Sequence, residues 1–291
     1  MKSFLRLLRV KQWVKNLFLF IPNFFAGGLF HTRTIKTVLA GVILFSLVAS
    51  AIYIINDLRD IQKDKLHPKK RFRPLASGEI KQSTAIILCI ILLITGMTLS
   101  TLITINFFYL LALYFIINLA YSFGLKNVPL IDLFVVASGF LIRIYCGGIL
   151  GDVSVSHWLA IMIFLLALFL VLAKRRDDLL IHSQTGATVR ATSKTYNLEF
   201  VNSCLTIFSA VIVVSYIMYT VSPEVIHRFG SDIVFVTSAF VIAGIMRYLQ
   251  ITFVEQNSGS PTSILYKDKF ILFTILGWIF TFFLIIYIYK L

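Results

Sequence analysis

Long apolar stretches separated by short polar ones occupy almost the whole chain, and they restrict it to a membrane-spanning helical fold. Several of these stretches reach or approach the roughly 20 residues that a helix needs to cross a bilayer. Only 14% of the 291 residues are charged, whereas a soluble chain of this length carries about 25%. Because the spans leave no room for a soluble domain, we expect a single all-α transmembrane domain over residues 1–291.

Nine candidate spans follow from the hydropathy pattern, and the short separations between them favour helical hairpins. Pro22 and the Gly27-Gly28 pair interrupt the first span and predict a kink there. The third and fourth spans almost merge near Thr104. The expected spans are 16–31, 36–56, 83–105, 107–123, 129–150, 156–173, 202–221, 232–252 and 270–289.

The cations are distributed unevenly between the two sides of this topology. The formal net charge is +14, which in a soluble protein would point to nucleic acid. Here the lysines and arginines lie mainly between spans, and with the N-terminus in the cytosol 22 of them are inside and four outside. Membrane topology and anionic headgroups explain this bias, so we expect no nucleic-acid partner. We expect the C-terminus outside and the polar loops 57–81 and 174–200 on the cytosolic face.

Asn56, Asp57, Asp60 and Asp64 follow the second span with helical spacing. On a continuing helix they lie along one face, where several carboxylates repel one another unless a cation lies among them. Oxygen donors without His or Cys suit Mg²⁺, which commonly bridges carboxylates to substrate phosphates. The alternative is an acidic, solvated helix end. We favour a Mg²⁺ site formed by all four residues, with Asp57 and Asp60 as the catalytic pair.

A run of cations comes next in the same loop: Lys69, Lys70, Arg71 and Arg73. A Mg²⁺-bound diphosphate carries more negative charge than one metal ion neutralises, and lysine and arginine can compensate the remainder. We therefore interpret Lys69, Arg71 and Arg73 as substrate-binding residues, with the two arginines preferred. The positive-inside bias explains the same cations without any ligand.

Ionisable residues also lie within or close to spans, where they are costly and usually have a partner or a task. Lys126 and Asp132 lie near the cytosolic ends of the fourth and fifth spans, and Arg143 lies deeper in the fifth. We interpret all three as substrate-binding. For Arg143, pairing with a neighbouring helix is an equally open interpretation.

Lys11 and Lys15 flank a tryptophan at the expected membrane interface. They either anchor the chain at the headgroups or hold the phosphate of a lipid substrate, and we list both as substrate-binding candidates. The cysteines, Cys89, Cys146 and Cys204, are scattered in or beside the spans. Such scatter is typical of packing residues and not of a disulfide framework or a metal site.

Five stretches of the chain resemble the UbiA superfamily of intramembrane prenyltransferases. The segment "NDLRDIQKDKLHPKKRFRPLASG" at 56–78 is similar to its first aspartate-rich motif, N-D-x-x-D-x-x-x-D. The other four resemble the decaprenyl-phosphate phosphoribosyltransferase branch of this superfamily, and together they narrow the resemblance to that branch. They are "LLRVKQWVKNLFLFIPNFFAG" at 7–27, "YSFGLKNVPLIDLFVVASGFLIRIYCGG" at 121–148, "LAKRRDDL" at 172–179 and "SPTSILYKD" at 260–268.

The resemblance, which covers essentially the full chain, implies nine helices around a lipid-open cavity with polar caps on the cytosolic side of a bacterial inner membrane. It implies transfer of 5-phosphoribose from 5-phosphoribosyl diphosphate (PRPP) to a polyprenyl phosphate, with Mg²⁺ as cofactor and release of diphosphate. The product would be a precursor of lipid-linked arabinose for cell-envelope glycans. Tyr121 and Lys126 match the branch pattern and are expected to line the site; Asp268 also matches, with no assigned role. A homo-oligomer is left open.

The loop after the sixth span distinguishes branches of the superfamily. Aromatic prenyltransferases carry a second motif there, D-x-x-x-D, whereas Asp177 and Asp178 of this chain are adjacent and follow three cations. A basic loop suits PRPP, which has a second phosphate on its 5-carbon. We expect Lys174, Arg175 and Arg176 to bind the donor phosphate, and Asp177 or its neighbour to contact metal or ribose hydroxyls. Positive-inside charge again offers a simpler explanation for the cations.

Three other functions stay in competition with this interpretation. The nearest is an aromatic prenyltransferase with a polyprenyl diphosphate donor, against which the missing second motif argues. A transporter or channel would often contain internal repeats, and none is convincing here. A non-catalytic lipid-binding scaffold would not need so dense an acidic cluster.

Overall fold

The computed structural model describes residues 2–28, 30–66, 70–185, 195–256, 264 and 267–288, and the regular elements in these ranges are all helical. The all-α architecture expected from the apolar pattern is therefore confirmed. The chain forms two compact units. The N-terminal unit consists of Met1–Lys126 and Ser138–Val155, and the C-terminal unit of Asn127–Ala137 and Ser156–Leu291.

Eight helical segments in the described ranges are long and apolar enough to span a membrane, and they correspond to eight of the nine expected spans. Two of them include a short stretch of other helical geometry. The eight are α3 (Thr32–Arg59), α5 (Gln82–Ile103), α6 (Ile105–Phe123), α7 (Ile131–Gly151), α8 (His157–Thr185), α9 (Leu198–Thr220), η5 (Ile233–Thr237) with α11 (Ser238–Phe253), and α13 (Lys269–Phe283) with η6 (Leu284–Ile288).

The remaining expected span, 16–31, is not one long α-helix. After α1 (Lys2–Leu7), the chain forms a 3₁₀ helix, η1 (Val10–Phe20), followed by the short helix α2 (Ile21–Phe25). Nine complete spans are therefore not confirmed in the part of the chain that the structure describes.

The breaks in this first segment have identifiable backbone causes. Arg9 has a left-handed backbone with φ of 51°, which separates α1 from η1. Pro22, which has no N–H to donate, lies at the start of α2. Gly27 has φ of 72°, a conformation that glycine adopts without strain, and it follows the end of α2. The interruptions expected at Pro22 and Gly27 are thus present.

Two boundaries at polar segments also differ from the expected ones. The helix α8 continues to Thr185, beyond the expected end at residue 173, so the "KRRDDLL" residues are helical. Hydropathy marks where a helix leaves the membrane and not where it ends, because lysine, arginine and leucine are all good helix formers. The acidic residues after the second span were expected on one continuing helix. Instead α3 ends at Arg59, and the following helix α4 (Ile61–Leu66) starts after a break at Asp60.

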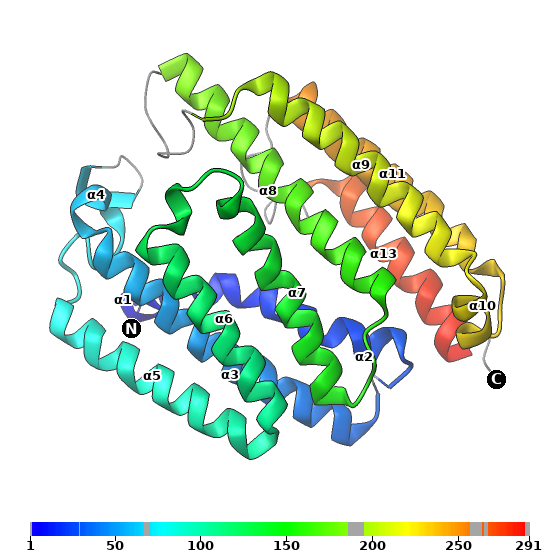
Figure 1. Cartoon of the computed structure of the whole chain (residues 1–291), viewed down its shortest axis with the longest axis horizontal. Coiled ribbons are helices and arrows are strands. Elements are labelled where there is room, and N and C mark those ends of the chain that lie inside the picture. The colour runs from blue at the N-terminus through cyan, green and yellow to red at the C-terminus, as the bar shows by residue number, and fades with distance from the viewer. Residues whose placement is uncertain are drawn as a thin grey trace. The chain divides into compact units, whose positions relative to one another are not determined.

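The helix α3 forms the centre of the N-terminal unit. It packs against α5, α6 and η1, as Figure 1 shows for α5 and α6. About two thirds (67%) of its apolar window is buried, compared with 17% for α5, so α5 is a peripheral helix. Phe45 and Val48 of α3 are completely buried in one core with Phe107 and Leu111 of α6. This central position of α3 carries the acidic residues at its C-terminal end into the protein.

The η1 segment packs closely on the second half of α7. At Gly147 of α7 a Cβ atom would approach the Leu19 carbonyl oxygen to 2.0 Å, so only glycine fits there. Arg143 Nε donates to Asn16 Oδ1 at 2.8 Å, and Asn16 Nδ2 donates to Ser46 Oγ of α3 at 2.8 Å. A glycine contact and a chain of buried hydrogen bonds therefore hold the irregular first segment against two spans.

The C-terminal unit is a bundle in which α8 packs on α9, α9 on α11, and α11 on α13 (Figure 1). The Tyr216 hydroxyl of α9 lies 2.7 Å from Thr237 Oγ1 and accepts a hydrogen bond from Trp278 Nε1 at 2.6 Å. This buried hydroxyl links α9, η5 and α13. The short helix α10 (Pro223–Phe229) follows α9 and ends at Gly230, whose φ is 64°.

Replacing Gly147 with alanine should destabilise the N-terminal unit. The new methyl group meets a backbone carbonyl that cannot rotate away, and overpacking of this kind costs about 1–3 kcal/mol. Thermal unfolding of the detergent-solubilised protein measures the effect. Gly28→Ala is the control, because the nearest atom to its new Cβ is Asn23 O at 4.0 Å. Equal unfolding temperatures for the two variants would contradict the close packing of η1 on α7.

Candidate functional site

The acidic residues at the end of α3 form a charge-balanced group that we call the aspartate cluster. Asp60 ends α3 with φ of −95° and ψ of 7°, and its N–H donates to Asn56 O at 3.0 Å. The N–H of Asp64 in α4 donates to Asp60 O at 2.8 Å, so the helical spacing persists across the break. The cluster consists of Asn56, Asp57, Asp60 and Asp64 together with Arg9, Arg73 and Lys126.

Asp57 is the most buried acid of the cluster, and two arginines balance its negative charge. Its carboxylate is 3% exposed and accepts hydrogen bonds from Arg9 and, at 3.0 Å, from Arg73 Nη1. Arg73 Nη1 also donates to Asp64 Oδ2 at 2.7 Å. Arg73, which follows η2 (Lys70–Phe72), therefore bridges two carboxylates and ties its loop to α3 and α4. The Arg9 guanidinium also lies 4.7 Å from the ring centroid of Tyr53.

Lys126 balances the negative charge of Asp60 in the same cluster. It lies in η3 (Leu125–Asn127), directly after α6. Its Nζ donates to both carboxylate oxygens of Asp60, at 2.8 and 2.7 Å, and lies 3.4 Å from Asn56 Oδ1. Lys126 therefore contacts the acidic residues themselves, and its expected role in binding substrate stays a prediction.

The donor chemistry of the cluster fits a hard divalent cation. In the described ranges no three His, Cys, Asp or Glu side chains converge closely enough to hold an ion. The oxygens instead form two pairs, each already bridged by a positive group: Arg73 between Asp57 and Asp64, and Lys126 between Asp60 and Asn56. Carboxylate and amide oxygens are ligand types that suit Mg²⁺. To bind here, the ion would have to replace Arg73 or Lys126 between the oxygens that they now bridge.

The C-terminal unit contains a second buried ionic group, which we call the Asp132 cluster. Asp132, at the start of α7, is 0% exposed, and its Oδ2 accepts from Arg175 Nε at 3.0 Å and Nη2 at 2.7 Å. The Tyr196 hydroxyl donates to Asp132 Oδ1 at 3.1 Å. Arg175 Nη1 also reaches Asp178 at 3.5 Å. Burial raises the pKa of Tyr196, and the neighbouring carboxylate raises it too, so the hydroxyl stays protonated and donates.

Arg176 has a different set of partners on the same helix. Its Nε donates to Asn202 Oδ1 of α9 at 2.8 Å, and its Nη1 donates to Thr252 O of α11 at 2.6 Å. Arg175 and Arg176 are both buried, whereas Lys174 is exposed and Asp177 is half-buried. The two arginines therefore join helices of the C-terminal unit, and contact with a donor phosphate would require them to exchange protein partners.

Arg143 is buried deep in the N-terminal unit among neutral groups. Besides Asn16, its guanidinium donates to Gly139 O at 2.6 Å and to the Tyr114 hydroxyl at 3.1 Å. Three aromatic rings surround it, with centroids 4.8 to 5.4 Å from its Cζ. These contacts explain how one charge is accommodated at membrane depth, and any substrate contact would come in addition to them.

The other residues expected from the sequence are dispersed. Lys11 is exposed and Lys15 half-buried, both on η1, and Tyr121 is half-buried near the end of α6. Arg71 is exposed and stacks on Phe72, with its Cζ 4.8 Å from the ring centroid. Lys69 lies outside the described residues.

Asp268 has a structural task. Its carboxylate caps α13 by accepting from the Ile271 N–H at 2.9 Å, and it pairs with Arg247 at 2.7 Å. The hydrogen bond from Arg247 lowers the pKa of Asp268. This role was not assigned from the sequence, although an aspartate before a long apolar helix is a recognised cap signal.

Two residues of the clusters were missed by sequence reasoning. Arg9 was counted only among the 22 cations expected on the cytosolic side, and its neighbours Lys11 and Lys15 were preferred as substrate-binding residues. Tyr196 was not considered at all. For Arg9 the only available signal was its place next to an expected interfacial segment, which does not distinguish it from the neighbouring lysines.

Comparison with known proteins identifies the class to which these features belong. The eight long apolar helices of the described ranges indicate a polytopic membrane protein. The model of the UbiA prenyltransferase family matches residues 18–263, and the chain belongs to this family.

Several relatives match over nearly the whole chain. The decaprenyl-phosphate phosphoribosyltransferase of Corynebacterium glutamicum is 30% identical, over 98% of this chain and 86% of the relative. The protein of the same name from Mycolicibacterium smegmatis is 31% identical, over 94% of this chain and 89% of the relative. A UbiA homolog from Archaeoglobus fulgidus, solved with DMAPP and Mg²⁺, has the same fold, with a TM-score of 0.72 and 22% identity over 98% of this chain and 99% of that chain.

Breaking the Asp132–Arg175 pair should strongly destabilise the C-terminal unit. Either Asp132→Asn or Arg175→Gln leaves an uncompensated buried charge, which costs about 3–5 kcal/mol. The double variant should lose less than the sum of the single losses, because both members of the Asp132–Arg175 pair are then neutral. The free energy of unfolding in detergent measures all three.

Arg228→Gln serves as the control for this experiment. Its partner Glu224 is 3.5 Å away and exposed, so the change should cost less than about 1 kcal/mol. If Asp132→Asn unfolds no more easily than this control, the buried pair is not structural.

Proposed function

We propose that this protein is an enzyme that transfers 5-phosphoribose from PRPP to a polyprenyl phosphate of the decaprenyl type, with release of diphosphate. The lipid product would be polyprenylphosphoryl-5-phosphoribose, a precursor of lipid-linked arabinose for cell-envelope glycans. The observation that carries this proposal is the match to phosphoribosyltransferases of about 30% identity over 94–98% of this chain. The aspartate cluster at the end of a membrane span gives that activity a site with suitable chemistry.

Asn56, Asp57, Asp60 and Asp64 would hold Mg²⁺ in this enzyme. When bound, the ion supplies a positive charge that stabilises the diphosphate leaving group. The Mg²⁺ bound in a solved structure of the same fold supports the use of a divalent ion. The oxygen-only donor set of the cluster supports it independently.

The cations of the cluster prepare the site for an anionic donor. Arg9, Arg73 and Lys126 are held near one end of α3 by the carboxylates that they contact. When the donor diphosphate enters, these groups exchange carboxylate oxygens for phosphate oxygens, and Arg73 can present two N–H groups to it. Asp57 and Asp60, no longer neutralised by these cations, would be the carboxylates that hold the divalent ion. Lys69 and Arg71, in the same loop, would add to the positive field.

The acceptor needs little activation by the protein. The oxygen of a polyprenyl phosphate is anionic at neutral pH, so it can attack the anomeric carbon without a general base. The chain's task is to orient the lipid phosphate, which we assign to Lys11 and Lys15 of η1 and to Tyr121 of α6. Arg143 would contribute through the position of η1, which it holds by its hydrogen bond to Asn16.

The remaining donor contacts are assigned to the polar end of α8 and the start of α7. Lys174, which is exposed, and the buried Arg175 and Arg176 would bind the 5-phosphate of the donor. Asp177 would contact metal or ribose hydroxyls, and Asp132 would position Arg175.

The excess of cations in the polar loops supports a cytosolic location for these loops, in a bacterial inner membrane with the N-terminus inside and the C-terminus outside. We treat residues 1–291 as one UbiA-like domain.

A transfer assay tests the proposed reaction. Purified protein is incubated with Mg²⁺, PRPP labelled in the ribose, and polyprenyl phosphate, and the lipid phase is then extracted. Label in the lipid phase is the expected result. Reaction only with a prenyl diphosphate and an aromatic acceptor would instead identify the enzyme as an aromatic prenyltransferase.

Asp57→Asn and Asp60→Asn should each reduce this transfer by at least about 100-fold, the scale on which loss of one group that stabilises transition-state charge acts. Asp152→Asn is the control, since it removes one exposed carboxylate from the same unit. All three variants should elute from size exclusion like the unchanged protein. Near-normal turnover in the Asp57 or Asp60 variant would disprove the metal assignment.

A test of the metal site that does not depend on activity uses Arg73. Arg73→Gln removes the cation shared by Asp57 and Asp64, so the variant should be less stable without divalent ions. Added Mg²⁺ should then raise its unfolding temperature more than that of the unchanged protein, because bound ligand stabilises the folded state. Arg71→Gln, an exposed change in the same loop, should show no extra gain. Equal Mg²⁺ effects in both variants would place the ion elsewhere.

A further inference from the structure

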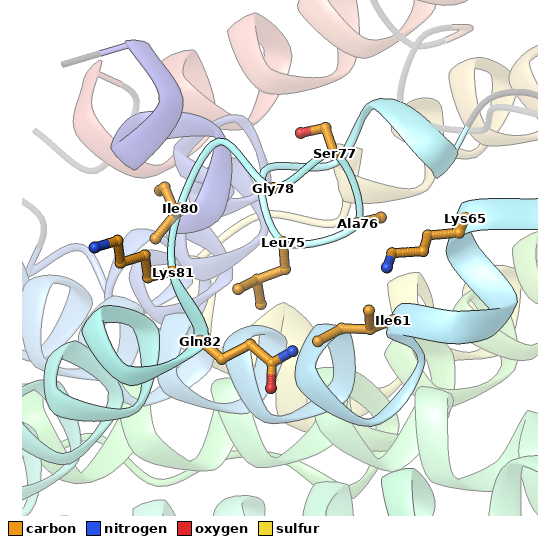
Figure 2. A pocket seen from close by; sticks show the side chains of 9 residues that line it. All are labelled: Ile61, Lys65, Leu75, Ala76, Ser77, Gly78, Ile80, Lys81 and Gln82. Carbon is orange, nitrogen blue, oxygen red and sulfur yellow. The ribbon is translucent and has the colours of Figure 1, made fainter.

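A pocket of about 410 Å³ lies between α4 and the loop that leads into α5 (Figure 2). Its floor consists of apolar side chains that are 5–7% exposed: Ile61, Leu75, Ala76 and Ile80. Ile61, Leu75 and Ile80 belong to a hydrophobic core that also includes Ala85 and Cys89 of α5. The floor is therefore rigid and continuous with the packing of the N-terminal unit.

The polar rim of this pocket has a positive charge and an amide. Figure 2 shows the Lys65 side chain extending from α4 toward Leu75 and Ala76, while the Gln82 amide points toward Ile61. Lys81 also lines the pocket, but its ammonium group points away in this view. In the described part of the chain, Lys65 has no ion-pair or hydrogen-bond partner.

The acids closest in sequence are engaged elsewhere. The Glu79 carboxylate accepts hydrogen bonds from Ser3 and Arg6, which lower its pKa, and it does not line the pocket. Asp64, next to Lys65 on α4, is buried and bonded to Arg73. No carboxylate is among the residues that line the pocket, so its electrostatic complement is an anion.

The start of α5 adds to the preference for an anion and gives the occupant an apolar extension. Lys81 is the N-cap of α5 and its side chain has no hydrogen-bond acceptor, so the first-turn N–H groups of this 22-residue helix have no side-chain cap. Along the helix, Ile87, Ile90 and Ile94 are 51–60% exposed, as expected of side chains that face lipid tails. A ligand with an anionic head and an apolar tail matches both features.

We propose that this pocket binds the phosphate headgroup of an anionic membrane phospholipid, with its acyl chains along α5. Lys65 donates to the phosphate, and the Gln82 amide donates to the phosphate or the glycerol oxygens. The apolar floor accommodates the glycerol backbone. We assign this lipid a place outside the proposed substrate site, since the pocket shares no lining residue with the aspartate cluster.

Binding of dioctanoyl phosphatidylglycerol to delipidated protein in detergent tests the proposal, with native mass spectrometry or thermal shift as the readout. Lys65→Gln should weaken binding roughly tenfold, the ratio expected for the loss of one charge-assisted hydrogen bond. Lys63→Gln removes the same charge from the exposed surface of α4 outside the pocket and should leave the affinity unchanged. Gln82→Trp keeps the charge but fills the opening, and should also weaken binding.

Two further ligands identify what the pocket recognises. Dioctanoyl phosphatidylcholine, which has no net charge, and glycerol 3-phosphate, which has no tails, should both bind much more weakly. Equal losses in Lys65→Gln and Lys63→Gln would show that only overall charge matters and would overturn the proposal. Equal affinity for glycerol 3-phosphate would overturn it in favour of a site for soluble phosphate esters.

Discussion

A carboxylate buried at the end of a membrane-spanning helix is costly unless a cation lies against it, and this constraint organises both polar clusters. The helix α3 carries Asp57 into the interior, where Arg9 from before η1 and Arg73 from the loop after α4 compensate it. In the C-terminal unit, Asp132 requires Arg175 in the same way. Because each pair joins segments that are distant in sequence, charge balance also determines where those segments pack.

The regular part of the fold could be predicted from the sequence because each turn of a helix that crosses the membrane needs apolar side chains, and these leave a continuous hydropathy signal. Hydropathy therefore identified α3 and the seven other spans in the described ranges. It could not identify η1, whose geometry depends on the contact of Leu19 with Gly147 and on the hydrogen bond between Asn16 and Arg143. Such pairings are invisible in a single sequence, because neither partner is unusual by itself.

The candidate site could be predicted from the sequence for its acids and for part of its cations. The spacing of Asp57, Asp60 and Asp64 indicated a shared location, and the structure places them around the break between α3 and α4. Of the cations that meet them, Arg73 and Lys126 had been named as site residues and Arg9 had not, because a basic arm has the same composition whether its charges face headgroups or carboxylates. Lys126 was singled out by its position near a span end, whereas Arg9 had no such distinction. The arginines of α8 were expected in a polar loop that binds the donor phosphate, since a helix that continues beyond the membrane was not anticipated.

The bridge made by Arg73 has a thermodynamic consequence for the loop that carries it. The same guanidinium that joins Asp57 to Asp64 keeps the turn after η2 attached to the end of α3. Any ligand that competes for those carboxylates, or for Arg73, must therefore also change the conformational freedom of the backbone in that turn. By reciprocity, rigidifying the turn alters ligand affinity by the same factor as the ligand alters the order of the turn. Residues of this loop that never touch a ligand thereby become determinants of how tightly one is held.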